Sequence, residues 1–308
     1  MQKNKWPAME MEWAYCVGRH EGNKDFLLLF HRQSFRSRTA RGIYAFLARA
    51  YGVSTVTHGY LATVNSDEGR YEVQELVAPP YIYEVDHMAW RLGDWRIVCD
   101  AVTRSLRVVA QDINIVAPWG ATGTLGEAPY SYISLPHVNG FLDYGISEHM
   151  PRNVAAHPYD GFHIQLETGE WIVLMLASWS FIDGSCGFVV HRDGSTVMLK
   201  REQVNISYIK TYQSKKTGVE YPIEWRLHIG LVGLDVVIQA NLEDQELDGH
   251  TFFSIRMWYG VALVSGSFAG KSVNGRAYVH SIRKQRFIIR VLGICGDIYY
   301  KALWISGH

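Results

Sequence analysis

The feature that most constrains the fold is a repeated pattern of short strand-like segments separated by turns. The segments are rich in Val, Ile, Thr and aromatic residues. Several alternate polar with apolar side chains, as in LRVVAQDINIVA (106–117) and EWRLHIGL (224–231). Turn-forming residues recur between them, for example NSDEGR (65–70) and HRDGS (191–195). Strands spaced roughly every 8–12 residues without helical patterns between them are typical of β-sandwiches and barrels. The pattern predicts an all-β chain.

One helix and one internal boundary are expected along the chain. The segment RTARGIYAFLARAYG (38–52) has helical propensity and ends in Gly52, a typical C-terminal cap. The segment from Trp119 to Asp160 is dense in Gly, Pro and His, which predicts a loop-rich seam between two halves. We therefore expect an N-terminal β-barrel domain over residues 1–154 and a C-terminal one over residues 155–308. A barrel of about eight strands can enclose one ligand.

Composition excludes several classes of function. The chain has 30 Lys plus Arg against 30 Asp plus Glu and no basic tail, which argues against nucleic-acid binding. The apolar runs at 26–30 and 171–177 are too short to cross a membrane, so no integral membrane segment is expected. The four cysteines match no zinc spacing and suggest buried thiols in a reducing compartment. With no apolar signal segment near the start, the sequence predicts a cytoplasmic protein.

Motifs for cofactor and metal chemistry are missing. The sequence has no Walker A, H-E-x-x-H or G-x-S-x-G motif, and its Gly-rich stretch lacks the strand–helix context of a dinucleotide site. The densest histidines could hold a metal together with nearby carboxylates, but no rigid i, i+2 or i, i+4 pair occurs among them. This group comprises His137, His149, His157 and His163, with Asp143, Glu148 and Asp160. We therefore expect no metal and no cofactor.

Several separated segments resemble one family, the carotenoid 1,2-hydratase and AttH-like proteins. The opening EWAYCVGRHEGNKDFLLLFHRQSF resembles the family's E-W-W-Y start, and FHIQLETGEWIVLMLA is similar to its Q-L-D-D-G strand pair. The segment TGVEYPIEWRLHIGLVGLDVVIQANLEDQEL is similar to the family's Y-P-x-x-W and D-Q-E motifs. Further matches are THGYLATVNSDEGRYEV, YSYISLPHVNGFLDYG and MWYGVALVSGSFAGKSVNGRAYVHSI. They occur in the family's order and cover nearly the whole chain.

This resemblance implies two lipocalin-like (calycin) antiparallel β-barrels packed side by side. The family includes carotenoid hydratases and fungal lipocalin-like cyclases that catalyse Diels–Alder reactions in a pocket between the barrels. Such members need no metal or redox cofactor and act on hydrophobic, polyunsaturated or polycyclic small molecules. An aromatic content of 13% independently suggests thick β cores or an aromatic-lined cavity.

Three family positions have changed residue type. Tyr259 in MWYG and His280 in GRAYVHS stand where the family carries Glu. The family's W-x-D motif is replaced by AAHPYDGFHIQL, which brings His157, Tyr159 and Asp160. Tyr and His can still donate hydrogen bonds or move protons, so the change predicts a different acid–base task from alkene hydration.

The candidate site residues follow from the resemblance, the seam and the strand pattern. Tyr259 and His280 lie on neighbouring strand-like segments joined by a Gly-rich turn, so they can meet across an antiparallel pair. The predicted catalytic residues are His58, Tyr132, His137, Tyr259 and His280. The predicted substrate-binding residues are Trp13, Tyr15, Arg32, Tyr144 and Trp225. The structural alternatives are core packing for the tryptophans and Tyr15, a strand-end ion pair for Arg32, and hydrogen-bonded structural roles for the histidines.

The leading functional prediction is a cofactor-independent, pericyclase-like cyclase or isomerase of natural-product biosynthesis. Its partner would be a hydrophobic small-molecule substrate folded into a reactive conformer, and orientation alone can contribute about 7–11 kcal/mol. Two alternatives stay open: hydration or dehydration of an isoprenoid alkene, and non-catalytic carriage of a hydrophobic ligand. The substrate, the stereochemistry and the oligomeric state do not follow from the sequence.

Overall fold

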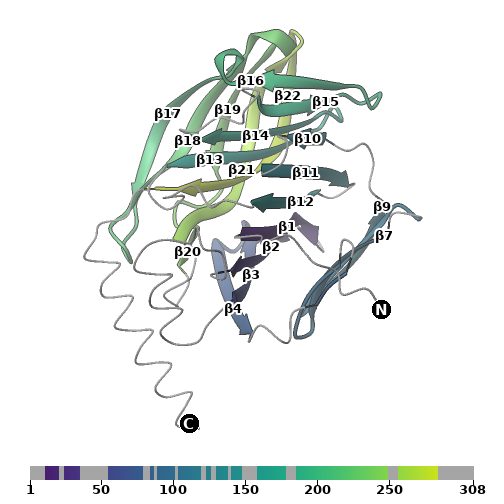
Figure 1. Cartoon of the computed structure of the whole chain (residues 1–308). Helices are drawn as coiled ribbons and strands as arrows, with labels where there is room; N and C mark the ends of the chain where they lie inside the picture. Colours follow the sequence, from purple (N-terminus) through teal and green to yellow (C-terminus); the bar gives the residue numbers. More distant parts are fainter. Residues whose placement is uncertain are drawn as a thin grey trace.

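The computed structural model describes twelve parts of the chain, and these form an all-β structure (Figure 1). The described residues are 11–20, 24–34, 55–78, 84–86, 89–100, 103–118, 123–125, 130–137, 140–147, 158–177, 185–248 and 256–283. The all-β prediction is confirmed. The helix predicted at 38–52 lies outside the described residues.

The strands up to residue 147 form two antiparallel sheets. Sheet A has seven strands in the order β10-β11-β12-β1-β2-β3-β4, and sheet B has five in the order β5-β6-β7-β8-β9. Sheet A comprises β1 (Met11–His20), β2 (Lys24–Ser34), β3 (Thr55–Asn65), β4 (Arg70–Ala78), β10 (Gly123–Leu125), β11 (Tyr130–His137) and β12 (Gly140–Ser147). Sheet B comprises β5 (Glu84–Asp86), β6 (Ala89–Leu92), β7 (Trp95–Asp100), β8 (Ser105–Ala110) and β9 (Ile113–Pro118).

The remaining strands form sheet C, which has ten strands and curls strongly (Figure 1). Its order is β16-β15-β14-β13-β22-β21-β19-β18-β17, with β20 paired to β21. The strands are β13 (Tyr159–Leu166), β14 (Trp171–Ala177), β15 (Ser185–Val190), β16 (Thr196–Lys200), β17 (Asn205–Gln213), β18 (Glu220–Ile229), β19 (Leu234–Ala240), β20 (Glu246–Asp248), β21 (Arg256–Phe268) and β22 (Lys271–Ile282). Short 3-10 helices follow β16 and β18: η2 (Arg201–Gln203) and η3 (Gly230–Val232).

The curl of sheet C closes around its own hydrophobic core. Trp225 of β18 is fully buried there and makes edge-to-face contacts with Phe162 and Trp258, with ring centroids 5.6 and 5.8 Å apart. At one end of the curl, the Tyr208 hydroxyl of β17 donates a 2.8 Å hydrogen bond to Asp160 of β13. Arg283 also binds Asp160, at 2.8 Å. Side chains therefore fill the inside of sheet C.

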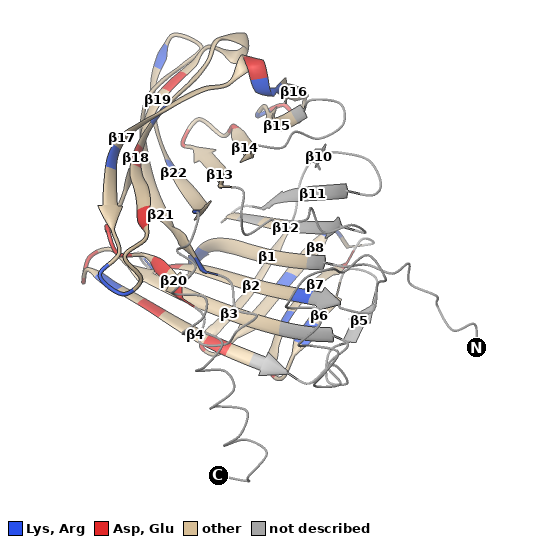
Figure 2. Ribbon diagram, turned by 60° about the vertical axis from the view of Figure 1, so that its left-hand side comes forward, with Lys and Arg blue, Asp and Glu red and all other residues tan. Residues whose placement is uncertain are grey.

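Sheet A has a hydrophobic core on each face. Strand alternation sends Ala14 and Cys16 of β1 into a core shared with sheet B, where Trp90 and Trp95 also pack. The same alternation sends Tyr15 and other aromatic or aliphatic side chains into a second core shared with sheet C. Strands β1, β2, β13 and β21 carry few charged residues and are drawn mostly in tan in Figure 2.

The apolar run of β14 is explained by this packing. Ile172 and Leu174 point into the core inside sheet C, whereas Val173 and Met175 point into the core between sheets A and C. A strand buried on both faces has no solvent side and therefore shows no polar alternation. Polar contacts also cross this interface, including the Arg276–Asp25 ion pair and a 2.8 Å hydrogen bond from Asn241 to Ser66.

Two finer expectations about the fold stay predictions. The strand orders of the three sheets, as far as the described residues show them, are open, so two closed barrels side by side are not confirmed. The boundary between residues 154 and 155 falls in a segment that the structure does not describe, between β12 and β13. Within the described residues, no helix is long and apolar enough to span a bilayer.

The core position of Trp225 makes a stability prediction. Trp225→Ala should lower the free energy of unfolding by about 3–5 kcal/mol, because it leaves a large cavity beside Phe162 and Trp258. His228→Ala, on the same strand but half exposed, should change it by less than about 0.5 kcal/mol. Urea unfolding measures both variants. Equal stabilities would contradict the packing described for sheet C.

Candidate functional site

A cluster of Tyr and His side chains lies in the core between sheets A and C. The hydroxyl oxygen of Tyr15, from β1, is 2.5 Å from Nδ1 and 2.6 Å from Nε2 of His163, from β13. The same oxygen is 3.4 Å from Nδ1 of His280, from β22. The two imidazole rings stack with centroids 5.6 Å apart. One hydroxyl and two imidazoles therefore lie in contact as one polar group, here called the Tyr15 cluster.

Two further tyrosines surround the Tyr15 cluster. Tyr259 of β21 makes an edge-to-face contact with Tyr15, with ring centroids 6.1 Å apart. Tyr159 of β13 makes a similar contact with His280 at 5.4 Å. Tyr15, Tyr259, His163 and His280 are buried, whereas Tyr159 is only half buried. Tyr159 is therefore the most exposed of these five side chains.

Strand pairing explains why these side chains meet. His280 lies directly opposite Gly161 on β13 and directly opposite Tyr259 on β21. A Cβ atom at position 161 would lie 2.0 Å from Nε2 of His280, so only glycine leaves room for this imidazole. Tyr15 then enters from sheet A, whose contact with sheet C brings it to His163.

The D-Q-E motif at 244–246 forms hydrogen bonds to the backbone of β21, the strand that carries Tyr259. The amide of Gln245 bonds the backbone of Val261 in both directions, at 3.0 and 2.9 Å. The backbone N–H of Tyr259 donates to the carbonyl of Gln245 at 2.9 Å. Buried Glu246 accepts hydrogen bonds from the hydroxyls of Ser214, Thr217 and Tyr221. This motif holds β21 in register beside the cluster and makes no contact within it.

Burial keeps both imidazoles of the cluster uncharged near neutral pH. It lowers the pKa of His280 to about 3. Burial, followed by repulsion from His280, holds the pKa of His163 well below its usual value. Burial and the nearby Asp160 charge raise the pKa of Tyr159. A neutral imidazole can accept a proton and a tyrosine hydroxyl can donate one, so the cluster is suited to proton transfer or to hydrogen bonding of a carbonyl.

The structure brings together three of the predicted site residues: Tyr15, Tyr259 and His280. The expectation that Tyr259 and His280 meet across paired strands is confirmed, because they are direct partners between β21 and β22. His163 and Tyr159 belong to the cluster although neither was predicted to be catalytic. His163 stood out in the sequence only as part of a His-rich segment, and Tyr159 as part of an altered family motif.

The other predicted residues lie elsewhere. Trp13 is half buried against the core between sheets A and C, two residues before Tyr15 on the same face of β1. His58 and Arg32 lie on β3 and β2, and Trp225 lies in the core inside sheet C. The backbones of Tyr132, His137 and Tyr144 belong to β11 and β12. The side chains of those three residues lie outside the description.

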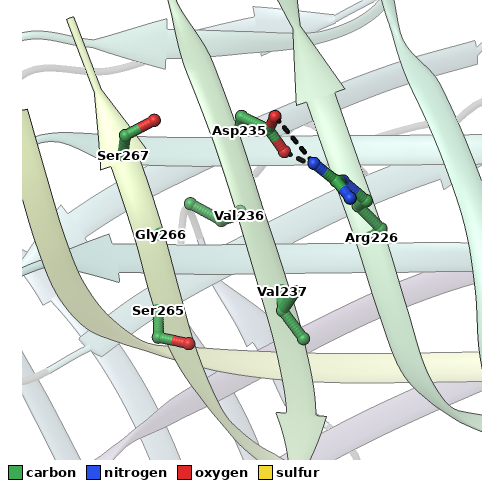
Figure 3. A pocket seen from close by; sticks show the side chains of 7 residues that line it. All are labelled: Arg226, Asp235, Val236, Val237, Ser265, Gly266 and Ser267. Atoms are coloured by element: carbon green, nitrogen blue, oxygen red, sulfur yellow. Dashed lines mark hydrogen bonds and ion pairs between the residues drawn. The ribbon is translucent and has the colours of Figure 1, made fainter. Parts of the chain in front are cut away.

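In the described parts of the chain, no group of three or more His, Cys, Asp or Glu side chains is placed to hold a metal ion. A hollow of about 270 Å³ lies on the outer surface of β18, β19 and β21 (Figure 3). It is lined by Arg226, Asp235, Val236, Val237, Ser265, Gly266 and Ser267. Its charges already pair with each other at 3.1 Å and are exposed to solvent, so this hollow lacks the desolvated polar groups of the Tyr15 cluster.

Comparison with known proteins shows a likeness to AttH-like proteins over part of the chain. The AttH-like family model matches residues 140–280, which confirms the resemblance predicted from the sequence. This segment contains β12 to β21 and most of β22, including His163, Tyr259 and His280. A comparison with curated protein sequences gave no match.

Solved structures support the same fold over most of the chain. A structure described as an AttH from Nitrosomonas europaea has a TM-score of 0.65 at 18% identity, covering 89% of this chain and 92% of that one. Kievitone hydratase from Nectria haematococca gives 0.57 at 17%, covering 91% and 90%. CghA with Sch210972 gives 0.55 at 11%, covering 90% and 89%. At these sequence identities the likeness concerns the fold alone. One of the three structures, kievitone hydratase, is an enzyme by its name.

The glycine opposite His280 provides a test of the site geometry. Gly161→Ala should displace the imidazole and lower the free energy of unfolding by about 1–3 kcal/mol, because the new methyl group takes the place of the His280 ring. Urea unfolding and the NMR signal of the His280 ring measure the two effects. The matched control is Gly230→Ala in η3, where the nearest atom is 3.5 Å away. An unshifted His280 signal would contradict the described packing.

The buried neutral histidines predict a pH-dependent stability. His163, His280 and also His31 have folded pKa values below their ordinary value of 6.5, so the unfolded chain binds more protons in mildly acidic solution. As pH falls below about 6.5, the free energy of unfolding should fall by about 1.4 kcal/mol per pH unit for each such histidine.

Urea unfolding between pH 7 and pH 5 measures this slope. His280→Gln removes one of the three titrating groups and should make the slope shallower. A slope that is flat in the unmodified protein would show that these imidazoles are not held neutral by burial.

Proposed function

We propose that the chain is a cofactor-independent cyclase or isomerase that acts on a hydrophobic small molecule between sheets A and C. The observation that carries this proposal is the buried hydroxyl–imidazole contact of 2.5 Å between Tyr15 and His163 inside a largely apolar core. Polar groups buried in such a place lose hydration, and chains tend to keep them there for function. The proposal includes both that the protein is an enzyme and that its substrate is a natural product.

The proposed chemistry uses each side chain according to its charge state. The Tyr15 hydroxyl donates a hydrogen bond to a carbonyl oxygen of the substrate. In an isomerisation it gives this proton to the substrate, neutral His163 removes another proton from the substrate, and transfer from His163 to Tyr15 restores both groups. Nδ1 of His280 lies 3.4 Å from the same hydroxyl and adds a second imidazole contact to it. Because the site is desolvated, each of these hydrogen bonds acts more strongly on the substrate than it would in water.

The aromatic side chains around the cluster would shape the substrate. Trp13, Tyr159 and Tyr259 offer ring faces that pack against a polyene or polycycle and stabilise a developing positive charge. Arg32 stays a proposed anchor for an anionic group. Tyr132, His137 and Tyr144 stay proposed site residues on the strands next to β1, with their roles open.

Hydration is the second candidate, and the fold shared with kievitone hydratase favours it. The same cluster can protonate an alkene from Tyr15 and activate water through an imidazole. The family's carboxylates at the positions of Tyr259 and His280 are replaced in this chain, which supports cyclisation or isomerisation instead. Carriage of an unchanged ligand is the remaining, non-catalytic candidate.

The architecture proposed with this function has two lipocalin-like barrels, over residues 1–154 and 155–308. Its support is the strand pairing, because the described strands before residue 148 and those after residue 158 pair only within their own group. A cytoplasmic location also stays a prediction.

The test of function is mass spectrometry. Small molecules extracted from the purified protein are identified, and the protein is incubated with polyene and isoprenoid candidates. A product isomeric with its precursor supports the cyclase or isomerase, and a gain of one water supports the hydratase. Ligand recovered unchanged without turnover of any candidate would replace the enzyme proposal with the carrier.

The role of the cluster is tested by Tyr15→Phe. Loss of the hydroxyl should lower turnover about 10²–10⁴-fold, the usual contribution of a positioned acid or base, while substrate binding changes far less. The matched control is Tyr221→Phe, which removes another buried, hydrogen-bonded hydroxyl outside the cluster. It should lower stability by about 1.5–3 kcal/mol and leave turnover intact. Unchanged turnover in Tyr15→Phe would remove this residue from the mechanism.

A further inference from the structure

A second buried polar group lies on the same face of sheet A as Tyr15. It consists of His31 on β2, His58 on β3 and Glu75 on β4. Trp13 of β1 pairs directly with His31, and His31 pairs directly with His58. Residues directly opposite each other in an antiparallel sheet project to the same side. All three polar residues therefore face sheet C, as Trp13 and Tyr15 do.

The hydrogen bonds of this group are incomplete. His58 Nδ1–H donates to Glu75 Oε1 at 3.2 Å, and the His58 ring stacks on Tyr60 with centroids 5.9 Å apart. Nε2 of His58 and Nδ1 of His31 are also buried. Neither of these two nitrogens has a hydrogen-bond partner in the described part of the chain. His58 is 1% exposed and His31 is 6% exposed, so water does not readily supply the missing bonds.

An unpaired buried polar atom destabilises the folded chain, and here two such atoms lie on neighbouring strands. Because Nδ1 of His58 faces the carboxylate of Glu75, this nitrogen carries a proton, and Nε2 is the nitrogen left to face a ligand. Burial, with repulsion from His58, lowers the pKa of His31 to about 3, so His31 adds no positive charge. The group therefore offers two buried ring nitrogens to a hydrogen-bonding group of a ligand.

The spacing between this group and the Tyr15 cluster indicates the shape of the ligand. His58 is two strands away from β1, which is roughly 10 Å across the sheet. In register, His58 lies level with Trp13, which is two residues from Tyr15 along β1. This offset is roughly 7 Å along the strands. His58 and Tyr15 are thus about 12 Å apart on one face, and His31 lies on the strand between them. A rigid or folded hydrophobic molecule of two or three rings spans such a distance.

We propose that Glu75, His58 and His31 form a subsite that binds a hydroxyl group, an alcohol, phenol or enol, at the end of the substrate remote from Tyr15. This inference rests on the proposed function, since it places the reacting end of the molecule at the Tyr15 cluster. His58 Nε2 accepts the hydroxyl proton. A site that pairs with a hydroxyl rejects the analogue that lacks one, so this group sets specificity.

The experiment is a binding measurement that needs no turnover. The probes are 4-hydroxybiphenyl and 4-methoxybiphenyl, titrated against the full chain by isothermal calorimetry. The hydroxyl compound should bind about tenfold more tightly, the size of one hydrogen bond to a buried acceptor. His58→Phe should abolish this preference while keeping an aromatic ring over Tyr60. Tyr15→Phe should leave the preference unchanged, which separates the subsite from the proposed reaction.

Carboxylate variants keep the test valid if His58→Phe does not fold. Glu75→Gln should reduce the hydroxyl preference, because the amide no longer fixes the proton on Nδ1. Glu72→Gln, at an exposed position on the same strand, is the matched control and should have no effect. Equal affinity for both probes, or no binding of either, overturns the subsite. A hydroxyl preference that disappears only in Tyr15→Phe assigns hydroxyl binding to the Tyr15 cluster instead.

Discussion

The packing of sheet A between two other sheets is the constraint on which the rest of the structure depends. Each strand of its centre must present apolar side chains on both faces, one toward sheet B and one toward sheet C. Burial of this size is the main favourable term in folding. It also removes water from the face that carries Tyr15, His31 and His58. The polar groups there gain their chemical character from that desolvation.

Within this apolar core, the described polar side chains include three groups along the interface. Arg276 and Asp25 form an ion pair at one place, the Tyr15 cluster lies in another, and His31 and His58 lie in a third. In the ion pair, each charged side chain faces a partner of opposite charge, and the pair links the two sheets. Burial favours the neutral imidazole of His163, His280 and His31 in the other two groups. A hydrophobic substrate with polar groups at its ends matches this arrangement better than a charged one does.

Sequence reasoning succeeded where a local pattern determines the structure. Alternation predicted the strands and placed Trp13 and Tyr15 on one face of β1, and the Gly-rich turn predicted that Tyr259 meets His280. The AttH-like resemblance was also visible in motifs spread along the chain, and the family match confirms it. The D-Q-E motif proved to be structural: Glu246 binds three hydroxyls and Gln245 binds the backbone of β21.

The sequence by itself determined the strands, their alternation and the family resemblance, because these depend on residues near one another along the chain. Only the tertiary structure decided that Tyr15 meets His163, since 148 residues separate them and no local pattern links sheet A to sheet C. It likewise decided that Trp225 lies inside the curl of sheet C and that Gly161 makes room for His280. Close packing joins distant segments through their shapes, and shape complementarity between two sheet faces is not encoded in any short stretch of residues.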